Sequence, residues 1–113
     1  MNRFERHHAN AVHFVKAAIG DMTFDPQAPQ LANSGRALVA FVLARKTGSL
    51  PYGFGNAVVA VLAEQGVPMK VRNVREATWA LRNMAEDRLQ VIRAVGVSNE
   101  DLEAAGKLIR GEH

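Results

Sequence analysis

The side chains best suited to metal chemistry in this 113-residue sequence are three histidines near its start. Two imidazoles lie on the same face of a helix when they are four positions apart in the sequence. No pair among His7, His8 and His13 has that spacing. We therefore expect no metal site here, with His13 facing solvent and His8 at the edge of the core.

Catalytic groups are equally hard to assemble from the sequence. The chain has no cysteine, which excludes thiol catalysis and disulfide bonds. The acidic pairs Glu86–Asp87 and Glu100–Asp101 are explained by helix caps and solvated faces, and serines 34, 49 and 98 by caps and turns. We predict a protein without enzymatic activity and without a cofactor.

Basic residues give the clearest functional signal, because they are concentrated in the middle of the chain. Residues 34–82 carry a net charge of +5, whereas residues 1–33 carry zero and residues 83–113 carry −2. Clustered lysine and arginine favour contact with nucleic acid, since they neutralise phosphates and release counterions. The alternative is that these charges only keep the surface soluble.

A long amphipathic helix is expected to position the basic residues. The apolar spacing predicts a helix over residues 73–95, capped by Asn73, with a stripe along one face. The stripe consists of Val74, Ala77, Leu81, Met84, Ala85, Leu89, Ile92 and Val95. The candidate binding residues lie on the opposite face or just before the helix: Lys70, Arg72, Arg75, Trp79, Arg82 and Asn83.

Trp79 is the most specific expectation of this register. It would lie opposite the apolar stripe, on the polar face, where either another element of the chain or a partner covers it, because burying such a ring stabilises by roughly 3 to 5 kcal/mol. We expect an intermolecular partner. The helix would also span about 34 Å, which is long for a domain of this size. We expect it to project and to pair in a homodimer.

Four further helices are expected, over residues 2–19, 34–44, 57–65 and 99–109. Two of them contain short apolar runs, 37–44 and 57–65, which are also compatible with buried strands and an α+β fold. Helix-ending residues around these runs favour helices. The prediction is an all-α, compact bundle of about five helices in a single domain, residues 1–113.

Several residues outside the long helix have expected structural roles. Phe4 and Phe14 should belong to the apolar face of the first helix. Asn56 and Gly66 should begin and end the third helix, as a cap and a left-handed residue. In the connections we expect aromatic rings to reach the core: Phe24, Tyr52 and Phe54.

Residues 56–84 resemble a helix-turn-helix unit. The positions that support the resemblance are Leu62, Ala63, Gly66, Val74 and Ala77. Gly66 occupies the place of the turn glycine in that superfamily, and the others correspond to the packed faces of its two helices. Residues 67–72 depart from the pattern, because they make the connection longer than the usual turn of about 3–4 residues.

The resemblance and the charge pattern favour a small DNA-binding or transcription-regulating protein. Lys70, Arg72, Arg75 and Arg82 would then contact phosphates or base edges of duplex DNA. The alternative is a helical protein-interaction module without nucleic-acid affinity, such as an adaptor, a chaperone-like subunit or an inhibitor. In that case the basic residues and Trp79 would bind an acidic protein surface.

The sequence also bears on location. No apolar run approaches the roughly 20 residues that span a bilayer. Charges interrupt the first residues, where a signal peptide needs a continuous apolar segment. We therefore expect a cytoplasmic protein that makes no membrane contact.

Overall fold

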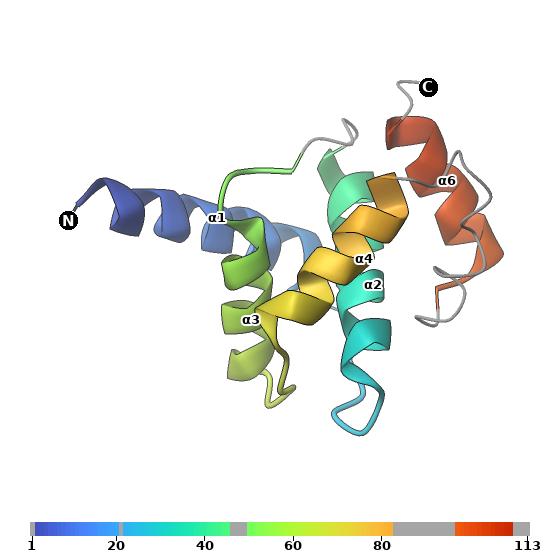
Figure 1. The fold of residues 1–113 in the computed structure, drawn as a ribbon, viewed down its shortest axis with the longest axis horizontal. Coiled ribbons are helices and arrows are strands. Elements are labelled where there is room, and N and C mark those ends of the chain that lie inside the picture. Colours follow the sequence, from blue (N-terminus) through green and yellow to red (C-terminus); the bar gives the residue numbers. More distant parts are fainter. Residues whose placement is uncertain (1, 21, 46–49, 83–96, 110–113) are drawn as a thin grey trace.

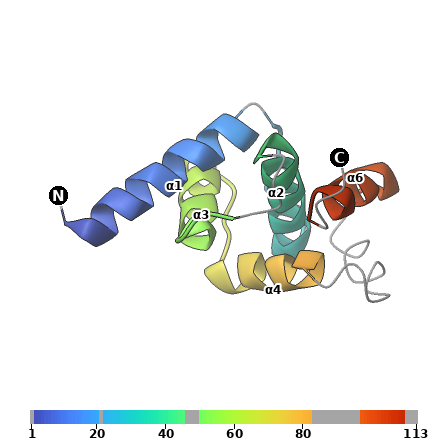
Figure 2. The same ribbon diagram turned by 90° about the horizontal axis from the view of Figure 1, so that it is seen from above.

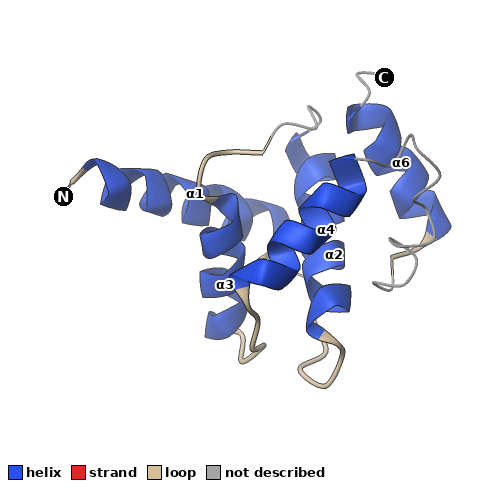
Figure 3. Ribbon diagram, viewed as in Figure 1, coloured by secondary structure: helices blue, strands red, loops and turns tan. Residues whose placement is uncertain are grey.

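The helices follow one another without strands in the part of the chain that the computed structural model describes, residues 2–20, 22–45, 50–82 and 97–109. They are α1 (Arg3–Ile19), α2 (Gln30–Arg45), α3 (Phe54–Glu64), α4 (Val71–Arg82) and α6 (Asn99–Ile109) (Figure 1, Figure 3). The predicted all-α class is confirmed, and both ambiguous apolar runs lie in helices. The radius of gyration is 13.3 Å, which is the value of about 13 Å expected for a compact chain of this length.

The second helix, α2, is the centre of the packing. It contacts α1, α4 and α6, while α3 packs against α1 and α4 (Figure 2). Its buried side chains occur on most of its circumference: Ala37, Leu38, Val39, Phe41 and Val42. Such a helix is stable only when neighbours cover it on several sides. This agrees with the expected central position of residues 37–44.

The start of α2 differs from the sequence prediction, which placed it at Ser34. The helix begins at Gln30, because the carbonyl of Pro29 accepts hydrogen bonds from the N–H groups of Ala32 and Asn33 at 3.0 and 3.3 Å. Asn33 is buried, and its side chain donates to the carbonyl of Asp25 at 3.0 Å. Polar side chains in this first turn therefore pack inside the molecule, which the apolar spacing does not indicate.

The N-terminal helix, α1, has a narrower buried face than expected. Ala11, Val15 and Ile19 are buried, whereas Phe4 is 64% exposed and Phe14 is 41% exposed. The prediction that both phenylalanines join the core is wrong. For Phe4 the reason is that the first half of α1 extends beyond the other helices (Figure 1).

The N-terminus of α1 is capped by a side chain, and the histidines of this helix lie where they were expected. The side chain of Asn2 accepts a hydrogen bond from the N–H of Glu5 at 2.8 Å, which satisfies one of the free donors of the first turn. His13 is exposed and His8 is partly buried. Gly20 follows the last helical residue, and its N–H donates to the carbonyl of Lys16.

The third helix, α3, begins three residues earlier than predicted. Gly53 precedes it in the left-handed conformation with φ of 76°, and the carbonyl of Gly53 accepts from the N–H of Ala57 at 3.2 Å. Asn56 is therefore a residue of the first turn, and its predicted role as the cap is wrong. Tyr52 is also mispredicted, since it is 76% exposed rather than packed on the core. Phe54 does pack against the core.

Two other connections agree with the sequence. Phe24 is buried, so it holds the proline-containing segment after α1 against the core, as predicted. At the start of α6 the hydroxyl of Ser98 accepts from the N–H of Asp101 at 3.2 Å, which confirms the predicted cap. Leu102 is buried one turn later.

Candidate nucleic-acid interface

The helix that carries most of the candidate binding residues, α4, lies across α2 and α3 on one side of the molecule (Figure 1, Figure 2). Its inner face packs on the core and contains Val74, Ala77, Thr78, Ala80 and Leu81, all buried. The predicted apolar stripe is therefore confirmed over its first turns. The continuation expected for residues 83–95 lies outside the described residues.

The outer face of α4 carries three of the six candidate residues, and a fourth lies directly before the helix. Arg72, Arg75 and Trp79 are exposed on it, together with Glu76, because steps of three and four residues return to one side of a helix. Lys70 is exposed directly before the first turn. Arg82 is the last residue of α4, but its side chain and the whole of Asn83 are outside the described part of the chain.

The start of α4 is held by a side chain from another helix. Gln30 of α2 accepts two hydrogen bonds with its Oε1 atom, from the N–H of Lys70 at 3.0 Å and from Nδ2 of Asn73 at 2.7 Å. The buried hydroxyl of Ser34 lies 3.3 Å from the carbonyl of Asn73. Asn73 thus lies within the first turn and binds α2, so the prediction that it caps the helix is wrong.

Gln30 was missed by reasoning from the sequence, although it fixes the position of the basic helix. It is separated from Lys70 by 40 positions, and no local pattern links residues so far apart. Gln30 acts as a cap for α4 that is supplied by another helix, α2. It satisfies a backbone donor at the start of α4, which otherwise has no partner within its own helix.

The connection between α3 and α4 contains the predicted turn glycine. Gly66 has φ of 77°, and its N–H donates to the carbonyl of Ala63 at 3.0 Å. The next residue, Val67, donates to the carbonyl of Leu62 at 2.9 Å, and both side chains are buried. This pair of bonds is the Schellman ending of a helix. Residues 65–70 separate the two helices, so the departure from a short helix-turn-helix connection remains.

The charges on the outer face of α4 are only weakly compensated. Nε of Arg72 lies 3.5 Å from Oε1 of Glu76, and the two side chains are 83% and 52% exposed. An exposed pair of this spacing contributes about 0.3–0.5 kcal/mol, which a phosphate can easily exceed. Among the described residues, Lys70 and Arg75 form no ion pair with a carboxylate.

Trp79 lies where the predicted register places it. The ring is 50% exposed, on the side of α4 opposite the buried Val74 and Leu81. This confirms that the ring lies outside the apolar stripe. Half of its surface remains accessible to a partner.

Two kinds of feature do not occur in the described part of the chain. No helix there is long and apolar enough to cross a membrane. No three histidine, aspartate or glutamate side chains lie close enough together there to hold a metal ion.

No family model, curated protein or solved structure matches the chain. The class of this protein is therefore defined by its fold alone, which is compact and all-α.

Proposed function

We propose that this protein binds duplex DNA through the exposed face of α4. The observation that carries the proposal is the division of this helix into two faces. One face is buried on α2 and α3, and the other presents Arg72 and Arg75, with Lys70 directly before it, to solvent. Phosphate groups bind such a cluster of cations favourably, because their neutralisation releases counterions.

The dimensions of an exposed helix suit this partner. A helix with its side chains is about 10–12 Å across, and the major groove of duplex DNA is about 12 Å wide. Arginine is also the residue that most often reads guanine in that groove, through two parallel hydrogen bonds. The lone acid on this face, Glu76, is paired with Arg72 and leaves Arg75 available.

Salt dependence tests the proposal. If Lys70, Arg72 and Arg75 each neutralise one phosphate, the logarithm of the affinity for a labelled duplex should fall with the logarithm of salt concentration at a slope of roughly −2.7. Between 50 and 200 mM salt the affinity should then fall about 40-fold. Fluorescence anisotropy measures this directly. Absence of binding at low salt would contradict the proposal.

A second candidate function is a protein-interaction module, and the half-exposed Trp79 favours it. Tryptophan and arginine are the residues that most often dominate protein interfaces, and both occur together on α4. The partner would be an acidic protein surface, or a second copy of this chain that covers the ring in a homodimer.

Trp79→Ala separates these two functions. The free energy of unfolding should change by no more than about 1 kcal/mol, because the ring is half exposed. In the interaction module, self-association measured by sedimentation velocity should weaken more than duplex binding does. A DNA-binding protein should instead lose more affinity when the arginines are replaced.

The opposite result for Trp79 is equally informative. If Trp79→Ala lowers the unfolding free energy by several kcal/mol and leaves association unchanged, the ring has a structural role. Urea denaturation followed by circular dichroism distinguishes the two outcomes.

A further inference from the structure

A groove lined by aromatic and basic side chains lies beside the N-terminal end of α4. Phe4 and His7 of α1 form one wall, Tyr52 and Asn56 lie at the start of α3, and Val71 and Arg75 belong to α4. The groove consists of adjoining hollows that share Phe4 and Tyr52, with volumes of about 500 and 240 Å³ for the two larger ones. We call it the aromatic groove.

The aromatic rings of this groove are unusually accessible. Tyr52 is 76% exposed and Phe4 is 64% exposed. His7, which is also exposed, packs against the Tyr52 ring in an edge-to-face arrangement with 5.8 Å between ring centroids. Flat, exposed rings of this kind offer surfaces on which another planar group can stack.

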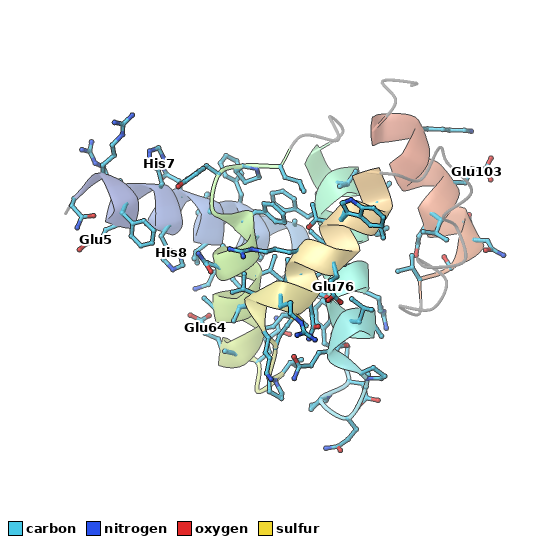
Figure 4. The ribbon with its side chains drawn as sticks, in the orientation of Figure 1. Glu5, His7, His8, Glu64, Glu76 and Glu103 are labelled. Atoms are coloured by element: carbon cyan, nitrogen blue, oxygen red, sulfur yellow. The ribbon has the colours of Figure 1, made fainter. Side chains whose placement is uncertain are left out.

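The charge of the groove has one sign. Arg3 lines the hollow at the α1 side and Arg75 lines the hollow at the α4 side, while no carboxylate lines any of the three hollows. Figure 4 shows Glu5 near the free end of α1, Glu64 on α3, and Glu76 on α4, where Glu76 is paired with Arg72. Glu64 is also paired with Lys16 at 3.3 Å. The charged side chains that line the groove therefore favour an occupant with negative charge.

These properties identify the chemistry of the occupant. It should combine flat rings that stack with anionic groups spaced along a chain, which is the composition of single-stranded nucleic acid. A duplex does not fit this description, because its bases are stacked inside the helix. A peptide anchor fits less well, since such anchors require deep pockets that exclude water, whereas the groove is shallow and open.

We infer that the aromatic groove binds unpaired nucleotides of a single strand adjacent to the duplex that α4 contacts. Arg75 connects the two surfaces, because it lies on the exposed face of α4 and also lines the groove. The inference rests on the proposed function, which supplies the nucleic acid. It adds a preference for a junction between duplex and single strand.

The test compares two labelled DNA probes by fluorescence anisotropy with the full chain. One is a blunt duplex, and the other is the same duplex with an oligothymidine overhang. The overhang should raise the affinity at least about fivefold, the lower limit for stacking one base on an aromatic side chain. Tyr52→Ala and Phe4→Ala should each reduce this gain and leave the affinity for the blunt duplex unchanged.

Phe14→Ala is the matched control. Phe14 is a partly exposed ring on the same helix as Phe4, but it does not line the groove. This variant should retain the full gain from the overhang. Circular dichroism should show unchanged helix content in all three variants, because the replaced side chains lie at the surface.

Each other outcome decides between the inference and the proposed function. Equal affinity for both probes overturns the inference and leaves the proposed function standing. Binding of free oligothymidine without binding of the blunt duplex supports the groove and overturns the proposed function. A gain from the overhang that persists in Tyr52→Ala and Phe4→Ala overturns the inference, as does displacement of oligothymidine by polyglutamate at lower concentration. Binding of neither probe overturns both.

Discussion

Replacing both Arg72 and Arg75 with alanine should lower the affinity for duplex DNA about 100-fold at low salt. Each arginine should contribute about 1.4 kcal/mol through a charge-assisted hydrogen bond to phosphate, which corresponds to tenfold per contact. The salt dependence should also become shallower, from a slope of roughly −2.7 to roughly −0.9, since only Lys70 would remain. Anisotropy titrations over a range of salt concentrations measure both quantities.

A charge-matched control distinguishes a local contact from a general effect of net charge. Arg36→Ala combined with Lys107→Ala removes the same two charges from α2 and α6, where both side chains are exposed. This variant should lose only a small part of the affinity. If both double variants weaken binding equally, α4 is not the binding surface.

Phe41→Ala should lower the free energy of unfolding by about 3–5 kcal/mol. Phe41 lies in the central helix α2 and is only 1% exposed, so its removal leaves a cavity as well as losing apolar burial. Domains of this size are stabilised by only about 5–15 kcal/mol in total. The midpoint of thermal unfolding should therefore fall by more than about 10 °C.

Phe14→Ala is the appropriate comparison for Phe41→Ala, because it removes the same ring from a partly exposed site. It should cost about 1 kcal/mol or less. Chemical denaturation followed by circular dichroism gives both values. If the two variants are equally destabilised, α2 is not the centre of the core.

The sequence predicts the class of this fold better than it predicts where helices begin. Apolar spacing and glycine at Gly66 are local signals, and they locate α1, α3 and the end of α3 within a few residues. The sequence places the starts of α2 and α4 four and two residues too late, at Ser34 and Asn73. They depend on Pro29 and on the side chain of Gln30, whose partners Lys70 and Asn73 lie far away in the chain.

In the candidate site, too, the sequence predicts the position of some residues and not of others. The outward position of Trp79 follows from helical period alone, because its neighbours on α4 define the buried side. The exposure of Phe4 and Tyr52 does not follow, since aromatic residues in an amphipathic pattern usually indicate core. The exposure of Phe4 depends on the extension of α1 beyond the other helices, which is a property of the whole bundle (Figure 1).

The separation of α4 into an inner and an outer face has a consequence for how this protein can change over generations. Arg72 and Arg75 are exposed, and the Arg72–Glu76 pair contributes little to stability. Substitutions at these positions are therefore nearly neutral for folding. The choice of partner can drift, or be redesigned, while Val74, Ala77, Leu81 and the hydrogen bonds to Gln30 keep the same helix in the same place.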